Sequence, residues 1–356
     1  MTRIPYRNSN IKFIVPIFII LLIGSFFIST KAKETTFRTE TNFNENWIFW
    51  TEENLEHKIE VSVPHIPRTE PLVVNNQWQG TMWYKKEFEL APGNNKNVFL
   101  RFEGIMHESD VWLNGIHLNH HMGGYLPIGI DLSKHLKEGK NTLTVKAINT
   151  DNPVIPPGKP LKDLDFNYYG GIYRDVELIT KNDVYVSDPM LANKTGGGGI
   201  LVHFSDISGE SARCSVKIHA MNGSGQEKEI YAEVVLTDGS GNSTSQKSSK
   251  VSVGPNRDNE FSISLDIDRP KLWNTTSPHL YTLTTKLYSN GQKVDSLSQK
   301  IGIRKIELNG EGFFLNDKKM YLRGTNRHQE YPYVGYAISN EANYRDAIKI
   351  KRAGFD

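Results

Sequence analysis

Residues 141–149 read NTLTVKAIN, a short run rich in threonine, leucine and valine that is typical of a β-strand. Three earlier runs have the same character: WYKKEFEL (83–90), NVFLRFEG (97–104) and SDVWLNG (109–115). Breaks rich in glycine, asparagine and proline separate the runs, for example APGNNKN (91–97) and KEGKN (137–141). Short strands at this spacing predict an all-β sandwich or jelly roll, which we place at residues 33–182.

A second block of strand-like runs, at residues 183–303, alternates apolar and polar side chains. Two examples are ARCSVKIHAM (212–221) and IYAEVVLTD (230–238), whose period of two is expected of strands that bury one face. A block of this length predicts an immunoglobulin-like β-sandwich, although the paired cysteines of antibody domains are absent. The glycine run at 196–199 has neither a following helix nor a Lys-Ser/Thr pair, so we interpret it as a loop and not as a phosphate site.

The pattern changes at residues 304–356. A strand-like stretch ends in YLRGTNRH (321–328), and the segment 339–356 has the first clear helical periodicity after residue 32. Ser339 or Asn340 can cap this helix, and Gly354 suits its C-terminal end. A strand, a loop and a helix make one βα unit, which cannot bury both of its faces alone. We therefore predict a mainly β chain that ends in the first βα unit of an incomplete (β/α)8 barrel.

The N-terminus has the features of a secretory signal peptide. Arg3, Arg7 and Lys12 precede an uncharged apolar stretch at residues 13–30, and small residues come after it. We predict a signal peptide at residues 1–32, with a membrane anchor through residues 13–30 as the alternative. Both imply export. The single cysteine, Cys214, excludes an intrachain disulfide and so favours a bacterial periplasmic or extracellular location.

Charge and histidine spacing give no support to two other classes of partner. The chain has 42 basic and 40 acidic residues, and a net charge of +2 does not indicate nucleic acid. The histidines of HLNHHMGG (117–124) have no carboxylate nearby at ligand spacing in the sequence, so we predict no metal site there.

Polar side chains gather where the predicted barrel strand ends: Asn326, Arg327, His328, Gln329 and Glu330. Functional residues of (β/α)8 barrels lie at the C-terminal ends of the strands. Asparagine and histidine can each donate or accept hydrogen bonds, as the recognition of hydroxyl groups requires. The alternative interpretation is a solvated polar loop.

A second candidate is KDLDFNYYGGIYRDVEL (162–178), in which aromatic and acidic residues precede a glycine pair. Rings cover the apolar face of a sugar while carboxylates bind its hydroxyl groups, so the stretch suits a sugar site. Core aromatics beside a β-bulge are the alternative. The Asn340-Glu341 pair resembles the Asn-Glu of several glycosidases, but its position at a helix start favours a capping role for Glu341.

Six segments, in this order, resemble glycoside hydrolase family 2, the family of bacterial β-galactosidases and β-glucuronidases. The first four resemble its sugar-binding-like jelly roll, the fifth its immunoglobulin-like domain and the sixth the opening of its catalytic barrel. The segments are GTMWYKKEF (80–88), FEGIMHESDVWLNG (102–115), HMGGYLPIGIDLSKHLKEGKNTLTVKAIN (121–149), DFNYYGGIYRDVEL (165–178), LWNTTSPHLYTLTTKL (272–287) with IGIRKIE (301–307), and YLRGTNRHQEYPYVGYAIS (321–339) with YRDAIKIKRAGFD (344–356).

The resemblance implies a retaining β-glycosidase that hydrolyses O-glycosyl bonds with two glutamates, one as acid/base and one as nucleophile. In the family these glutamates lie on the fourth and seventh barrel strands, so we expect both beyond residue 356 and assign no catalytic residue here. We expect this chain to be an inactive portion of a longer enzyme, most similar to a β-galactosidase. The alternatives are a β-glucuronidase, a β-mannosidase or a non-catalytic carbohydrate-binding protein.

The resemblance also implies substrate-binding residues. Asp165 matches a jelly-roll aspartate that binds sugar hydroxyls, and His328 matches a substrate-contacting histidine of the β-galactosidases. Asn326 is a further candidate, and whether Gln329 or Glu330 points into the site stays open. The expected partner is a β-linked oligosaccharide or glycan. Mg²⁺ or Na⁺, and a homo-oligomer, are expectations for the whole enzyme only.

Overall fold

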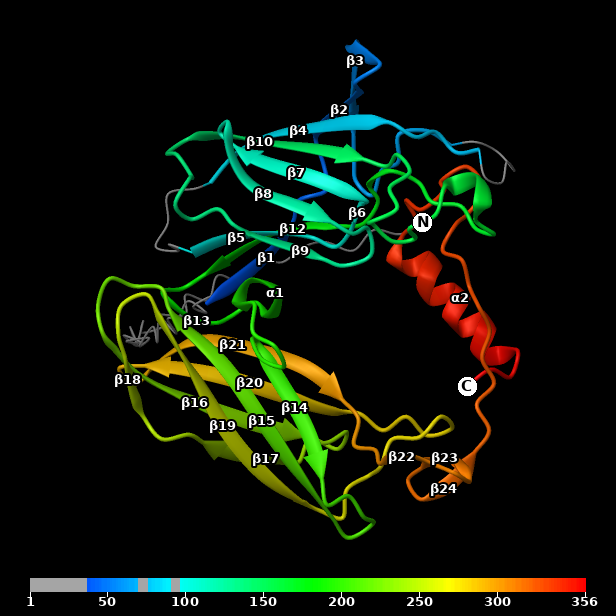
Figure 1. Cartoon of the computed structure of the whole chain (residues 1–356). Helices are drawn as coiled ribbons and strands as arrows, with labels where there is room; N and C mark the ends of the chain where they lie inside the picture. Colours follow the sequence, from blue (N-terminus) through cyan, green and yellow to red (C-terminus); the bar gives the residue numbers. More distant parts are fainter. Residues whose placement is uncertain (1–36, 70–75, 91–96) are drawn as a thin grey trace, which may run out of the picture. The chain divides into compact units, whose positions relative to one another are not determined.

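The structure is a computed structural model that describes residues 37–69, 76–90 and 97–356 (Figure 1). The predicted signal peptide (1–32) and the alternative anchor (13–30) lie outside the described residues. As predicted, the regular structure is mainly β. It also has a 3₁₀ turn, η1 (Leu161–Asp163), and two α-helices, α1 (Pro189–Ala192) and α2 (Asn340–Arg352). Within the described ranges, neither α-helix combines the length and the apolar character of a membrane span.

The strands up to β12 form a jelly roll of two antiparallel sheets and one short pair (Figure 1). The first sheet has the order β1-β12-β5-β9, the second β3-β2-β4-β10-β7-β8, and β11 pairs with β6. Their bounds are β1 (Arg38–Asn42), β2 (Trp47–Thr51), β3 (Asn54–Val61), β4 (Thr81–Glu89), β5 (Asn97–Phe102), β6 (Ile105–Met106), β7 (Glu108–Leu113), β8 (Ile116–Met122), β9 (Ile128–Asp131), β10 (Lys140–Ile148), β11 (Gly171–Ile172) and β12 (Val176–Lys181).

Strand β10 explains the packing between the two sheets. Leu143, Val145 and Ala147 are fully buried, whereas the threonines and the lysine that alternate with them are half-buried. Val145 pairs with Tyr84 on β4 and with Val111 on β7, and all three side chains belong to one core. The strong period of two therefore places one face of the sheet inside, where apolar burial supplies the main stabilising free energy.

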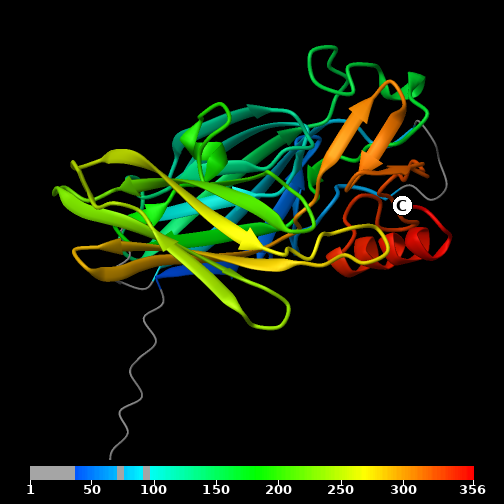
Figure 2. The ribbon, with the colours of Figure 1, turned by 90° about the horizontal axis from the view of Figure 1, so that it is seen from below.

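The second block forms an immunoglobulin-like sandwich (Figure 2). Its longest strands, β15 and β19, pair along their whole length. One sheet has the order β13-β15-β14 with β19 on β15, and the other β17-β16-β20-β21 with β18 on β16. Their bounds are β13 (Val184–Val186), β14 (Ile200–Ser205), β15 (Ser211–Asn222), β16 (Lys228–Thr237), β17 (Ser243–Lys247), β18 (Val251–Val253), β19 (Arg257–Asp268), β20 (Tyr281–Ser289) and β21 (Gln292–Ile301). Cys214 lies in this core, and burial raises the pKa of its thiol to about 11.

The glycine run at 196–199 is a loop, as predicted, and a buried polar network ties it to the sandwich. Ser187 Oγ accepts from the Gly199 N–H at 2.9 Å and lies 2.7 Å from His219 Nδ1. His219 Nε2 in turn lies 2.7 Å from Asp258, which also pairs with Lys194. Ser187 and His219 are both buried, so this serine, histidine and aspartate hold the loop in place and expose no nucleophile.

A buried carboxylate joins the jelly roll to the second sandwich. Asp295 on β21 is 1% exposed and accepts from the Arg38 guanidinium of β1 at 2.9 and 3.3 Å. It also accepts from the Val186 N–H at 2.8 Å. Because every one of these donors is directed at one buried group, the contact fixes both the distance and the orientation of the two strands.

The last region begins with a small antiparallel sheet, β22 (Ile306–Asn309), β23 (Gly312–Leu315) and β24 (Lys318–Met320). Helix α2 begins at residue 340, with Ser339 Oγ accepting from the Ala342 N–H at 3.3 Å. Gly354 has a φ of +93°, the left-handed conformation expected just after a helix. The predicted helix, its cap and its terminating glycine are therefore confirmed.

The expected strand at 321–328 is not formed. Residues 321–330 belong to no strand, and among the described residues their single backbone–backbone hydrogen bond is from Asp356 N to Arg323 O, at 3.0 Å. A parallel strand needs a ladder to neighbours on its flanks. Residues 321–330 have no such ladder, so of the expected βα unit only the helix α2 is formed.

We expect Asp295→Ala to lower the free energy of unfolding by about 3–5 kcal/mol, because the mostly buried guanidinium of Arg38 loses its charged partner. Urea denaturation at neutral pH measures the shift. The matched control is Asp268→Ala, whose ion pair with Arg269 is 80% and 77% exposed and which should change the value by less than about 1 kcal/mol. Equal shifts for the two variants would contradict this assignment.

We also expect a pH-dependent contribution from Asp258. Hydrogen bonds from Lys194 and then His219 lower the pKa of Asp258 from 3.8 to about 2. A carboxyl whose folded-state pKa is depressed stabilises the fold above its unfolded pKa, and this stabilisation is lost as the pH falls from about 4 to about 2. In the variant Asp258→Asn, the free energy of unfolding should fall less over that pH window than in the wild type. The difference should be below about 1 kcal/mol, because the Asp258 side chain is 37% exposed. An unchanged slope in acid-denaturation series would contradict it.

Candidate functional site

The stretch 164–173 of the jelly roll places its tyrosines inside the protein. Tyr168, Tyr169 and Tyr173 are 1%, 6% and 1% exposed and form a separate hydrophobic cluster. Of the two interpretations of this stretch, the burial of the tyrosines favours core aromatics. Phe166, one residue after Asp165, is the ring of this stretch that stays half-exposed.

The carboxylate of Asp151 holds this stretch in place through three hydrogen bonds. Asp151 accepts from Gln79 Nε2 at 2.7 Å, from the Leu161 N–H at 2.9 Å and from the Tyr168 hydroxyl at 3.1 Å. Burial by itself raises the pKa of Asp151, but these hydrogen bonds outweigh it and the pKa is lowered. The ionised carboxylate therefore fixes both ends of the loop that carries Asp165.

The segment that leads into α2 packs on the same cluster. Tyr336 is 3% exposed, and its ring centroid lies 5.4 Å from that of Tyr169 and 5.5 Å from that of Tyr173. Its hydroxyl donates to the backbone oxygen of Asn167 at 2.5 Å. Burial raises the pKa of Tyr336, so the hydroxyl keeps its proton and remains a donor. Residues 328–338 are thereby fixed on the jelly roll.

The five polar residues of the predicted strand end separate into three groups. Arg327 donates to Asp346 of α2 at 2.6 and 3.1 Å and to Asn343 at 2.8 Å. Hydrogen bonds from Tyr331 and then Arg327 lower the pKa of Asp346. Arg327 is thus used to attach the helix and is not directed at a ligand.

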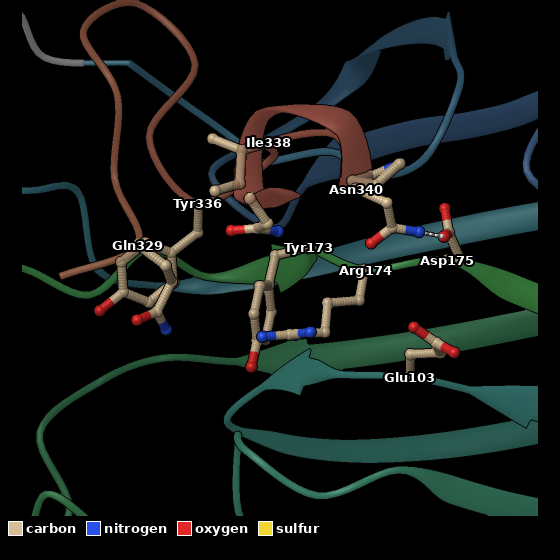
Figure 3. A pocket seen from close by; sticks show the side chains of 10 residues that line it. Glu103, Tyr173, Arg174, Asp175, Gln329, Tyr336, Ile338 and Asn340 are labelled. Atoms are coloured by element: carbon tan, nitrogen blue, oxygen red, sulfur yellow. Dashed lines mark hydrogen bonds between the residues drawn. The ribbon is translucent and has the colours of Figure 1, made fainter. Parts of the chain in front are cut away.

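Gln329 and Glu330 face the jelly roll. Gln329 lines a small cavity with Tyr173 and Tyr336, between the jelly roll and the start of α2 (Figure 3). At its rim Asn340 Nδ2 donates to Asp175 at 3.0 Å. Glu330 accepts from Asn167 Nδ2 at 3.1 and 3.3 Å. Glu330 is therefore paired with the jelly roll, whereas Gln329 lines the small cavity.

His328 and Asn326 form the third group, with exposed side chains. The His328 ring stacks on Phe166, with centroids 5.6 Å apart and planes inclined by 29°. Asp165, the residue before Phe166, is also exposed. The structure therefore brings His328 against the residue next to Asp165, although the two segments are far apart in the sequence. Asn326 lies two residues away, and its side chain makes no hydrogen bond to the described part of the chain.

The histidines at 117 and 120 show a feature that sequence spacing missed. Because β8 pairs with β7, both reach the same carboxylate: Asp110 Oδ1 lies 2.8 Å from His117 Nε2 and 3.0 Å from His120 Nδ1. Even so, no group of three or more histidine, cysteine or acidic side chains in the described ranges is arranged to hold a metal ion.

Sequence reasoning also missed Phe166, Asn167 and Glu330 as neighbours of His328. Phe166 and Asn167 lie in the aromatic and acidic stretch 162–178, and Glu330 lies in the polar row 326–330. Their positions within these two stretches were the available signal. The pairing itself has no local signature.

Two models of one family match the chain. The model described as "Glycosyl hydrolases family 2, sugar binding domain" matches residues 35–182, and the one described as "Glycosyl hydrolases family 2" matches residues 201–304. Together they include more than half of the sequence.

Named relatives carry two activities. A β-galactosidase of Thermoanaerobacter pseudethanolicus is 29% identical over 88% of this chain and 42% of its own length. A β-glucuronidase of Bacteroides fragilis is 29% identical over 95% of this chain and 47% of its own length. A solved structure of Bacteroides uniformis β-glucuronidase 2 superimposes with a TM-score of 0.81 at 25% identity, covering 89% of this chain and 39% of the other. The chain thus spans less than half the length of these relatives.

We expect Tyr336→Phe to lower the free energy of unfolding by about 1–3 kcal/mol, because the buried carbonyl of Asn167 loses the hydroxyl that donates to it. Chemical denaturation followed by tyrosine fluorescence measures the change. Tyr333→Phe is the matched control, since Tyr333 is 77% exposed and its loss of a hydroxyl should leave stability unchanged. Comparable effects of the two variants would show that the Tyr336 hydroxyl is not important.

Proposed function

Because the chain belongs to glycosyl hydrolase family 2, we propose that it forms the sugar-binding wall of a β-glycosidase, with Asp165, His328 and Asn326 facing the substrate. The observation that carries this proposal is the stacking of His328 on Phe166, beside Asp165. This stacking brings three groups together at one exposed place. They are the Asp165 carboxylate, which accepts hydrogen bonds, the His328 ring, which can donate or accept them, and the aromatic ring of Phe166. Those are the groups that a sugar ring with its hydroxyls and apolar face requires.

The proposal assigns binding to this chain and bond cleavage to residues outside it. Retaining hydrolysis needs two carboxyl groups about 5 Å apart, one of them able to give a proton. Glu341, the residue of the Asn-Glu pair, is in the first turn of α2, as the capping interpretation predicts. A hydrogen bond from its own backbone N–H and then one from Ser339 lower the pKa of Glu341, which is the wrong direction for a general acid.

The proposed substrate is a glycan with a terminal β-linked sugar, and β-galactoside is the first candidate. His328 supports it, through the similarity of its segment to the β-galactosidases. β-Glucuronide is the second candidate, because relatives and solved structures named as β-glucuronidases match the chain equally well. The proposed location is outside the cytoplasm, as the basic and apolar residues 1–32 indicate.

The binding proposal predicts that Asp165→Asn and His328→Ala each weaken binding of a β-galactoside or β-glucuronide to the 356-residue chain by about tenfold or more. Saturation-transfer NMR and calorimetry with the p-nitrophenyl glycosides measure it. Asp163→Asn is the control, since Asp163 is a nearby exposed aspartate on η1.

The same preparations test the assignment of cleavage. Neither glycoside should release p-nitrophenol with this chain, whereas a longer protein that contains it should hydrolyse one of them. Release by the chain of residues 1–356 would contradict the placement of the catalytic pair. Unchanged affinity in both site variants would contradict the binding role of Asp165 and His328.

A further inference from the structure

Two side chains connect the jelly-roll loop directly to the segment that carries His328. Asn167 Nδ2 donates to both carboxylate oxygens of Glu330, at 3.1 and 3.3 Å. Asn167 is the residue after Phe166, and Glu330 is two residues after His328. The pair therefore lies beside the stacked rings of Phe166 and His328, on the inner side of the contact.

The pair is built into the protein. Asn167 is 7% exposed, and its backbone oxygen accepts from the buried Tyr336. Glu330 is half-buried. A hydrogen bond that a carboxylate accepts is about twice as strong as one between neutral groups. Loss of the amide donor would therefore remove a strong contact between the segment and the jelly-roll loop.

The segment has few other restraints. Residues 321–330 have no strand ladder, and Arg327 attaches to α2. Among the described residues, the contacts between the jelly roll and residues 328–336 include the stacking of His328 on Phe166, the Glu330–Asn167 hydrogen bonds and the burial of Tyr336. The hydrogen bonds from the neutral Asn167 amide to the Glu330 carboxylate have a defined geometry and so restrict movement of the segment along the jelly roll, whereas apolar burial alone is non-directional.

We propose that Glu330 is a positioning residue, with Asn167 as its partner, which fixes His328 against Phe166 and so sets the His328–Asp165 geometry of the sugar site. The inference rests on the proposed function for its sugar-binding part. The positioning part depends only on the contacts of the chain and has a readout of its own.

The test exchanges the two groups. Asn167→Asp places two carboxylates at hydrogen-bond distance and should separate the segments. Glu330→Gln keeps an oxygen that accepts from Asn167 and should disturb the contact less than Asn167→Asp does. The double variant N167D/E330Q restores one amide donor and one carboxylate acceptor in reversed positions, so it should rescue the single variant Asn167→Asp.

The first readout is the chemical shift of the His328 ring protons in the full chain, which reports the ring current of Phe166. Phe166→Leu gives the reference value without that ring. Asn167→Asp should move the His328 signals toward this reference, and the double variant should return them to the wild-type position. Glu307→Gln, an exposed substitution in β22, should leave them unchanged.

The second readout is the affinity for the p-nitrophenyl glycoside. Asn167→Asp should weaken binding about tenfold, and the double variant should recover it to within about threefold of wild type. Circular dichroism tests whether each variant is folded. If Asn167→Asp does not fold, Glu330→Ala is compared with Glu330→Gln. Affinity for the glycoside should then be lost in Glu330→Ala and retained in Glu330→Gln.

Each result has a separate meaning. The positioning role would be overturned if the double variant failed to restore the His328 signals. It would also be overturned if the substitution of residue 167 left these signals unchanged. Restored signals with an affinity that never changes would overturn its connection to sugar binding. If wild type binds neither glycoside while the ring signals respond as expected, the proposed function fails and the positioning of His328 stands.

Discussion

The burial of Tyr336 in the tyrosine cluster of the jelly roll is the contact on which the candidate site depends. The segment from residue 321 to 330 has no strand neighbours, so its position depends on the residues between it and α2. The ring of Tyr336 between Tyr169 and Tyr173 supplies apolar burial, and its hydroxyl on Asn167 supplies direction. Beside this contact, Glu330 accepts from Asn167 and His328 lies on Phe166.

The second sandwich makes this contact feasible. The chain leaves the jelly roll after β12 and returns to it near residue 328, and a flexible connection of that length would lose entropy when its ends meet. A folded sandwich has already lost that freedom. Asp295 joins its β21 to Arg38 of the jelly roll, and Asn182 Nδ2 donates to the Val294 oxygen at 2.9 Å. The folded second sandwich therefore directs the chain back to the jelly roll. The candidate site is built from residues that precede this sandwich in the sequence and residues that follow it.

Much of the fold was predictable from local pattern. The alternation in residues 141–149 and 212–221 indicated the strands, and Ser339 and Gly354 indicated the ends of α2, because each signal depends on residues a few positions apart. The failures have non-local causes. The tyrosines at 168, 169 and 173 have the composition of a sugar platform, yet they form a core since Tyr336 covers them. The strand at 321–328 has the right residues and lacks the neighbours that would make it a strand.

The sequence by itself determined the mainly β class of the chain and indicated the candidate residues Asp165, His328 and Asn326. Strand periodicity, helix caps and the order of six segments are properties of neighbours along the chain, and they suffice for the two β-sandwiches. Only the tertiary structure decided which side chains of the row 326–330 are exposed. Glu330 pairs with Asn167 of the jelly roll and Arg327 with α2, whereas the side chains of His328 and Asn326 are exposed. Such long-range pairing depends on the folded arrangement of both sandwiches, which no local pattern records.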